Sequence, residues 1–260
     1  MFKKVRDDAY VSEIIDFVKN DYFHCPFLYT NLVKYGIHNP NTSLYVLTEQ
    51  KSLIAVAFLY YDCLHLYFRN SFKDFDNIIH IINELNPRKI FMPSSNSTLS
   101  LPLLDYSSKE VLVMAPKHFS DIDTSYVKNA EQSDIYRIAQ FMCTEWADGY
   151  DSVADLCQQM SERIADNYGR TKYIESEGNI VACVSSYAEL NDFAVCGGLL
   201  VSDTQRGKKL GSVMLRAIYE ELSKEGKSPC GIIVEDYSRI FHEKNGFAIV
   251  GKIVQCTKHT

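Results

Sequence analysis

The apolar residues in the second half of the chain change their spacing several times, and each change predicts a new element. Runs with helical spacing alternate with short dense runs typical of strands. Ser152 stands directly before one helical run, as an N-cap residue would. The expected helices cover residues 135–142, 152–164, 210–222 and 238–245. The expected strands cover residues 125–128, 172–175, 180–187, 193–201, 231–234 and 247–255. This alternation, with a tight hairpin turn at 177–179, predicts a mixed α/β sheet.

The first half of the chain repeats a blurred version of the same order. Its expected elements are a helix at 8–19, strands at 43–48, 53–60 and 63–68, a helix at 75–85 and a strand at 89–92. A polar segment at 117–124 follows a last strand-like run at 111–114. We therefore expect two related domains, 1–123 and 124–260. Each is an α/β (mixed α+β) domain with a central, mostly antiparallel sheet flanked by helices.

Glycine separates the two halves more clearly than the apolar pattern does. Of the 12 glycines, only Gly36 lies before residue 140. Glycine is needed where the backbone takes a positive φ or approaches a ligand closely. A ligand site is therefore expected in the second half.

Composition narrows the class of protein. The chain has 260 residues, 46% of them hydrophobic, and a net charge of −6, which gives no sign of a nucleic-acid partner. It has no apolar run long enough to span a membrane, and no apolar run follows the basic residues Lys3 and Lys4 as in a signal peptide. The 8 cysteines form no CxxC pair, so neither a metal site nor a disulfide framework is expected. These features favour a cytoplasmic protein.

The segment with the clearest chemistry joins the strand at 193–201 to the helix at 210–222. It contains Arg206, Gly207, Lys208, Lys209, Leu210, Gly211 and Ser212. Backbone N–H groups in the first turn of a helix lack intrahelical partners and attract anions, and small residues let a phosphate approach. The alternative is a basic surface turn. Neither a P-loop nor a GxGxxG motif is present, since the first P-loop glycine would fall on Glu221.

Two motifs here resemble those of the GNAT superfamily of acyl-CoA-dependent N-acyltransferases. Arg206-x-x-Lys209-x-Gly211 is similar to the family's [Gln/Arg]-x-x-Gly-x-[Gly/Ala], with Lys209 in place of a glycine. A second motif, His242-x-x-x-Gly246-Phe247, is similar to Tyr-x-x-x-Gly-Phe, with His242 in place of the tyrosine, and begins 31 positions after Gly211. The whole chain looks like bacterial proteins in which a degenerate GNAT-like domain precedes an intact one.

The resemblance implies a ternary complex in which a primary amine attacks the thioester of acetyl-CoA directly. In it, backbone groups of Leu199, Leu200 and Val201 would contact the pantetheine arm, and residues 206–212 would bind the pyrophosphate. The acceptor would be a small-molecule or peptide amine, bound near 146–155, and the protein a monomer or homodimer. No metal is implied.

The chemistry requires a base for the ammonium group and a proton for the departing thiolate. Glu189 and Asp192 flank a turn between two expected strands and are candidate bases, although solvated turn carboxylates are an equal alternative. His242 is the candidate acid because it occupies the tyrosine position, and Tyr237 is its rival. A strand N–H could stabilise the oxyanion. Cys196, in an apolar run, is expected in the core.

Two other functions stay open. The departures at Lys209 and His242 would suit a non-catalytic acyl-CoA sensor or interaction module. Aminoacyl transfer from tRNA is a weaker alternative, because the sequence has no obvious basic surface.

Overall fold

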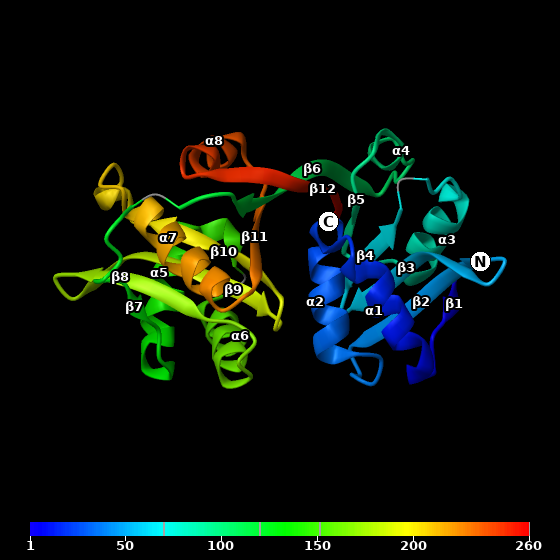
Figure 1. Ribbon diagram of the computed structural model, residues 1–260, viewed down its shortest axis with the longest axis horizontal. Coiled ribbons are helices and arrows are strands. Elements are labelled where there is room, and N and C mark those ends of the chain that lie inside the picture. Colours follow the sequence, from blue (N-terminus) through cyan, green and yellow to red (C-terminus); the bar gives the residue numbers. More distant parts are fainter. Residues whose placement is uncertain (70, 120, 151, 260) are drawn as a thin grey trace. The chain divides into compact units, whose positions relative to one another are not determined.

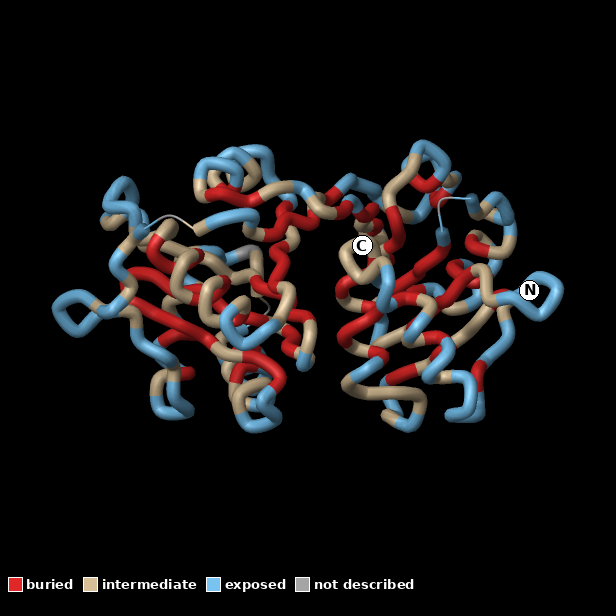
Figure 2. Tube along the Cα trace, viewed as in Figure 1, coloured by how far each residue is buried: buried red, intermediate tan, exposed pale blue. Residues whose placement is uncertain are grey.

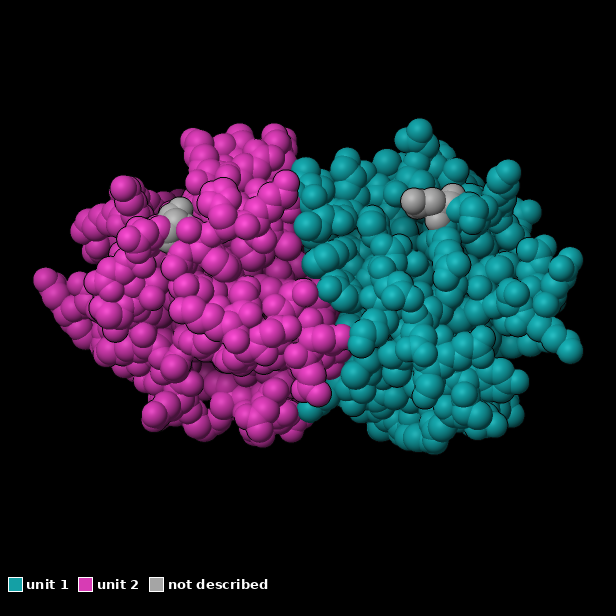
Figure 3. All heavy atoms as spheres, in the orientation of Figure 1, with its two compact units in different colours: residues 1–113, 249–260 teal, residues 114–248 magenta. Residues whose placement is uncertain are grey.

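The computed structural model describes residues 1–69, 71–119, 121–150 and 152–259 and divides into two compact units. Unit 1 contains residues 1–113 and 249–260, and unit 2 contains residues 114–248 (Figure 3). This division differs from the expected one at 123/124, mainly because the C-terminal residues belong to unit 1. The reason is strand pairing: Thr257 pairs with Lys89 and Ile253 with Pro93. Such a long-range pairing leaves no local signal in the sequence.

Unit 1 consists of helices on a mixed sheet (Figure 1). Its helices are α1 (Val11–Lys19), α2 (Pro26–Tyr35), α3 (Phe75–Leu85) and α4 (Asn96–Leu99). Its strands are β1 (Lys3–Lys4), β2 (Thr42–Glu49), β3 (Ser52–Tyr60), β4 (Cys63–Phe68), β5 (Lys89–Pro93) and most of β6 (Tyr106–Pro116) and β12 (Phe247–Lys258). They lie in the order β1-β2-β3-β4-β5-β12-β6. The pairs from β1 to β4 are antiparallel, and β4 pairs with β5 in parallel.

Unit 2 has the same kind of architecture. Its helices are α5 (Ile135–Glu145), α6 (Val153–Ala165), α7 (Leu210–Lys224) and α8 (Asp236–Lys244). Its strands are β7 (Lys128–Asn129), β8 (Thr171–Ser176), β9 (Asn179–Glu189), β10 (Phe193–Val201) and β11 (Ser228–Ile233). They lie in the order β11-β10-β9-β8-β7, with the end of β6 beside β11. The expected mixed α/β class is confirmed.

The apolar faces of these elements form the core, visible as the buried segments of the tube in Figure 2. In unit 2, Ile138 and Met142 of α5 and Leu156 and Met160 of α6 pack on Cys183 of β9. Ser152 caps α6 as expected, since its hydroxyl accepts a hydrogen bond from the Asp155 N–H at 3.0 Å. Among the described residues, no helix is long and apolar enough to cross a membrane.

Candidate functional site

The parallel pairing between β10 and β11 stops before either strand ends. It runs from Phe193 opposite Ser228 to Cys196 opposite Gly231. β10 then continues to Val201 and β11 to Ile233 without further pairing to each other. Beyond Cys196 the two strands therefore separate, and their facing backbone groups become available to a ligand.

Two compensating irregularities shape the β9–β10 pairing next to this separation. The partner of β10 moves from Ala188 at Val195 to Ser186 at Cys196, so Tyr187 is an extra residue on β9. Between Gly197 and Leu200 the extra residue lies on β10 instead. Gly198, in this second bulge, has a φ of +62°. Bulges of this kind redirect backbone groups next to functional sites. Sequence reasoning identified the strand but missed the bulge, whose signal is the glycine pair inside an apolar run.

The connection from β10 to α7 forms the expected strand–turn–helix junction. Gly207 has a φ of +84°, and Lys209, the N-cap of α7, takes the left-handed conformation with a φ of +62°. No side chain caps α7 and its first turn contains no acidic residue. The first N–H groups of α7 are thus open to an anion, with exposed Arg206, Lys208 and Lys209 around them.

Contacts within and next to this turn involve Arg206 and Gly211. Arg206 forms an exposed ion pair with Asp203 at 2.6 Å, which orders the turn but competes with any bound anion. Gly211 has a second reason to be small, because a Cβ there would lie 3.0 Å from the Phe241 ring of α8. Leu199, Leu200 and Val201 join the bulge to this turn. All the expected coenzyme-binding residues therefore lie on one continuous stretch from the bulge into α7.

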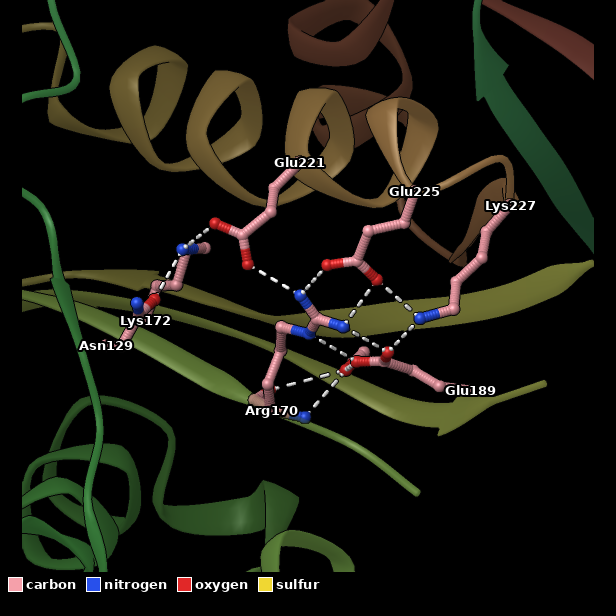
Figure 4. A network of polar contacts seen from close by, with 8 residues as sticks. Asn129, Arg170, Lys172, Glu189, Glu221, Glu225 and Lys227 are labelled. Carbon is pink, nitrogen blue, oxygen red and sulfur yellow. Dashed lines mark hydrogen bonds and ion pairs between the residues drawn. The ribbon is translucent and has the colours of Figure 1, made fainter. Parts of the chain in front are cut away.

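Glu189 does not have the surroundings of a general base. Arg170 donates to both of its carboxylate oxygens at 2.8 and 2.7 Å, and Lys227 donates at 2.9 Å (Figure 4). The Ser186 hydroxyl donates at 2.5 Å. Burial raises its pKa, but these hydrogen bonds outweigh burial and lower the pKa overall. The expectation that Glu189 accepts a proton from the amine is not supported, because its oxygens are already engaged by cations.

Asp192 lies at the wrong end of β10 for the same task. It precedes the strand, and its carbonyl accepts a hydrogen bond from the Ser228 N–H at 2.9 Å. Five residues of extended chain, about 16 Å, separate it from Gly197 in the bulge. The structure therefore does not bring Asp192 together with the bulge or with the turn that begins α7.

His242 is buried on α8, and its hydrogen bond fixes the proton on one nitrogen. Nδ1 donates to the Ser238 carbonyl at 2.7 Å, since a carbonyl can only accept. Burial lowers the pKa of the imidazole, although the bond to Ser238 opposes this. The ring also lies edge-on to Phe247, with centroids 5.3 Å apart. A neutral His242 has no proton on Nε2, so the expected role as an acid is not supported.

Tyr237, the rival acid, lies in the first turn of α8 and is 76% exposed. Its side chain is therefore accessible to solvent. Cys196 is buried, and burial raises the pKa of its thiol, which agrees with the expected place in the core. In the described part of the chain, no group of His, Cys, Asp and Glu side chains could hold a metal ion.

Comparisons with solved structures identify the class of fold. The chain matches an acetyltransferase of the GNAT family from Colwellia psychrerythraea over 100% of both chains, with a TM-score of 0.65 and 14% identity. It matches a tandem GNAT protein of the clavulanic acid biosynthesis pathway over 99% of this chain and 97% of that one, with a TM-score of 0.62 and 11% identity. A GCN5-related N-acetyltransferase from Sphaerobacter thermophilus matches over 99% and 95%, with a TM-score of 0.64 and 15% identity. The fold of the whole chain is that of tandem GNAT proteins.

The family follows from the sequence of unit 2. Residues 133–247 match the model of the acetyltransferase (GNAT) family. They include both motifs and both separated strands. Residues 133–247 therefore form a domain of the GNAT superfamily. No curated protein sequence matches the chain significantly.

Proposed function

We propose that unit 2 is an acyl-CoA-dependent N-acyltransferase that moves acetyl from acetyl-CoA to a primary amine. The observation that carries the proposal is the separation of β10 from β11 beyond Cys196 and Gly231, which leads directly to the uncapped, cation-flanked start of α7. The pantetheine arm would lie along Leu199, Leu200 and Val201, and the pyrophosphate would bind the backbone of residues 206–212.

With the coenzyme in this position, the thioester would lie beside the bulge. A neutral amine attacks the thioester carbon, the C–S bond breaks, and the nitrogen loses a proton, so that an amide, the coenzyme A thiolate and a proton form. The N–H groups redirected by the bulge at Gly197 and Gly198 would stabilise the oxyanion. We assign the protonation of the thiolate to Tyr237, because its side chain is accessible whereas His242 is buried and lacks a proton on Nε2.

Calorimetry with acetyl-CoA, joined to a thiol-release assay over a panel of amines, tests this function. Arg206→Glu should weaken acetyl-CoA binding about 10- to 100-fold, because it places a carboxylate where the pyrophosphate binds. Lys224→Glu is the matched control: Lys224 is an exposed cation in the last turn of α7, and its reversal should leave affinity unchanged. Failure of the folded wild-type protein to bind acetyl-CoA would reject the proposal.

A non-catalytic acyl-CoA sensor is the second candidate. It is favoured by the engagement of Glu189 and the neutral state of His242, which remove the expected base and acid. Micromolar binding of acetyl-CoA without thiol release for any amine would favour this candidate over the enzyme.

A further inference from the structure

The ring of Tyr187 lies against the bulge, on the face of the sheet that α5 and α6 cover. Gly197 and Gly198 make room for Tyr187: a Cβ on Gly197 would lie 2.4 Å from a Tyr187 ring carbon, and one on Gly198 would lie 2.7 Å from the Tyr187 hydroxyl. The extra residue of β9 and the extra residue of β10 thus face each other. The Tyr187 ring is held directly against the bulge.

The loop between α5 and α6 adds a second hydroxyl at the same place. The Tyr150 hydroxyl lies 3.3 Å from the Tyr187 hydroxyl, and either oxygen can be the donor. It would also lie 3.5 Å from a Cβ on Gly198. Burial raises the pKa of both hydroxyls, so they stay neutral. Trp146 packs edge-on against Tyr150, with ring centroids 5.6 Å apart, and is 51% exposed.

A cation completes this group. The Arg163 guanidinium, near the end of α6, lies 5.0 Å from the centroid of the Tyr187 ring. It donates to the Gln159 side-chain carbonyl at 3.0 Å, and no carboxylate that the structure describes lies within ion-pair distance of it. Arg170, only seven residues later, pairs with three carboxylates. Among the described residues, no carboxylate thus neutralises the charge of Arg163, and stacking on Tyr187 holds it in place.

We propose that the acceptor is an amine that also carries a carboxylate, such as an amino acid, and that Arg163 binds this carboxylate. This inference rests on the proposed function, which puts the thioester at the bulge. A planar guanidinium matches a carboxylate with two parallel hydrogen bonds. With the carboxylate on Arg163, the Tyr187 ring is the surface along which the rest of the acceptor extends toward Gly198. The amine nitrogen forms the new bond to the acyl carbon and loses a proton, the C–S bond breaks, and the thiolate gains a proton.

The test compares amino acids with their carboxamides in the thiol-release assay, using wild type, Arg163→Gln and Arg137→Gln. Wild type should have a kcat/KM at least about 10-fold higher for the acids. The amine of a carboxamide is less basic, so more of it is neutral and able to attack. In a site that does not recognise the carboxylate, the carboxamides would therefore react faster, and a preference for the acids is informative. Arg163→Gln should lose about 10- to 100-fold for the acids and little for the carboxamides. Arg137→Gln removes an exposed arginine paired with Glu175 and should change neither.

Binding readouts separate this inference from the proposed function. Trp146 is the single tryptophan of the sequence and lies beside Tyr150, so its fluorescence can report acceptor binding in the presence of coenzyme A. Equal kcat/KM for acids and carboxamides, with acetyl-CoA still bound, would overturn the carboxylate subsite and leave the transferase standing. Amino-acid binding that disappears in Arg163→Gln, without turnover of any amine, would support the subsite and reject the transferase. A fluorescence response identical in both proteins would reject the subsite.

Discussion

Units 1 and 2 use the same strand arrangement but differ in what occupies the place where the parallel strands separate. In unit 2 the last pair is Cys196 and Gly231, both small. In unit 1 the last pair of β4 and β5 is His65 and Phe91, whose rings stack with centroids 5.6 Å apart. Phe27 of α2 packs on both rings. In unit 1, large side chains thus fill the position where the parallel strands separate. In unit 2, small residues leave this position to the backbone.

The connection from β4 to α3 in unit 1 also lacks the anion-binding features of the connection from β10 to α7 in unit 2. Residues 69–74, between β4 and α3, contain no glycine. Asp74 is the N-cap of α3 and Asp76 lies in its first turn, so carboxylates stand at the start of this helix, although neither side chain caps it by a hydrogen bond. The start of α7 has cations instead. The comparison indicates that the two units share a sheet arrangement, whereas only unit 2 has the features that we expect to bind an anion.

The largest expected effect concerns the charges that unit 2 buries. Arg170 bridges Glu189, Glu221 and Glu225 (Figure 4). Arg170→Leu should destabilise unit 2 by about 3 kcal/mol, because it leaves the buried Glu189 with fewer partners. Urea unfolding followed by Trp146 fluorescence reports on unit 2, the unit that contains this residue. Arg137→Leu, a change at an exposed ion pair, should have little effect. Equal midpoints for wild type and Arg170→Leu would contradict a stabilising role for the network.

The second prediction uses pH to separate the units. Burial lowers the pKa of His65 to about 3, so its folded-state value lies below its unfolded one, near 6.5. The unfolded state then binds more protons below pH 6.5, and unit 1 loses stability as the pH falls from there toward 3. The loss should reach about 2 kcal/mol by pH 5. Far-UV circular dichroism in urea should record this loss, and His65→Phe should remove it.

The Glu225 carboxylate of unit 2 should respond to acid in a lower window than His65. The hydrogen bond from Arg170 lowers the pKa of Glu225 to about 2, from an ordinary value of 4.5. Its contribution is present above pH 4.5 and is lost as the pH falls toward 2. The lowered pKa of His242 also costs unit 2 stability below pH 6.5, so Trp146 fluorescence should report a midpoint that is stable between pH 6.5 and 5 only in a His242→Phe variant. A midpoint that instead falls in parallel with unit 1 would show that the two windows are not separate.

The third prediction concerns the two connections. Lys208→Glu should weaken acetyl-CoA binding about 10-fold, because Lys208 is next to the open N–H groups of α7. Lys73→Glu makes the same charge change in the exposed connection of unit 1 and should have no effect. Calorimetry should also give one site per chain. Two sites, or equal losses from both variants, would remove the functional distinction between the units.

The elements with strong local signals could be predicted from the sequence, and so could the strand–turn–helix junction between β10 and α7, for which phosphate binding stays a prediction. The strand at 193–201 matches β10, and Ser152 caps α6. Helix α2 was missed, since Leu28, Tyr29 and Leu32 in it are buried but give no clear amphipathic pattern. The placement of β12 was missed because its partner, β5, is remote in sequence. The roles of Glu189 and His242 depend on contacts with Arg170, Lys227 and Phe247, which only the folded chain brings together.

The smallest expected effect isolates the residue that departs from the family motif. Lys209 adopts the left-handed conformation, with a φ of +62°, which costs a residue with a Cβ about 1 kcal/mol or more. Lys209→Gly removes this strain but adds backbone entropy to the unfolded chain, worth roughly 0.5–1 kcal/mol. A net gain of about 0.5 kcal/mol in the free energy of unfolding is expected.

Lys209→Ala separates the backbone from the charge at this position. It removes the same cation as Lys209→Gly but keeps a Cβ, so both variants should bind acetyl-CoA a few-fold more weakly while only the glycine variant gains stability. Urea unfolding followed by Trp146 fluorescence measures the stability, and calorimetry measures the affinity. Full affinity in the alanine variant would mean that Lys209 contributes through its backbone alone. Equal stability of both variants would mean that the left-handed turn carries no strain, and the glycine of the family motif would then serve the approach of the phosphate rather than the backbone conformation.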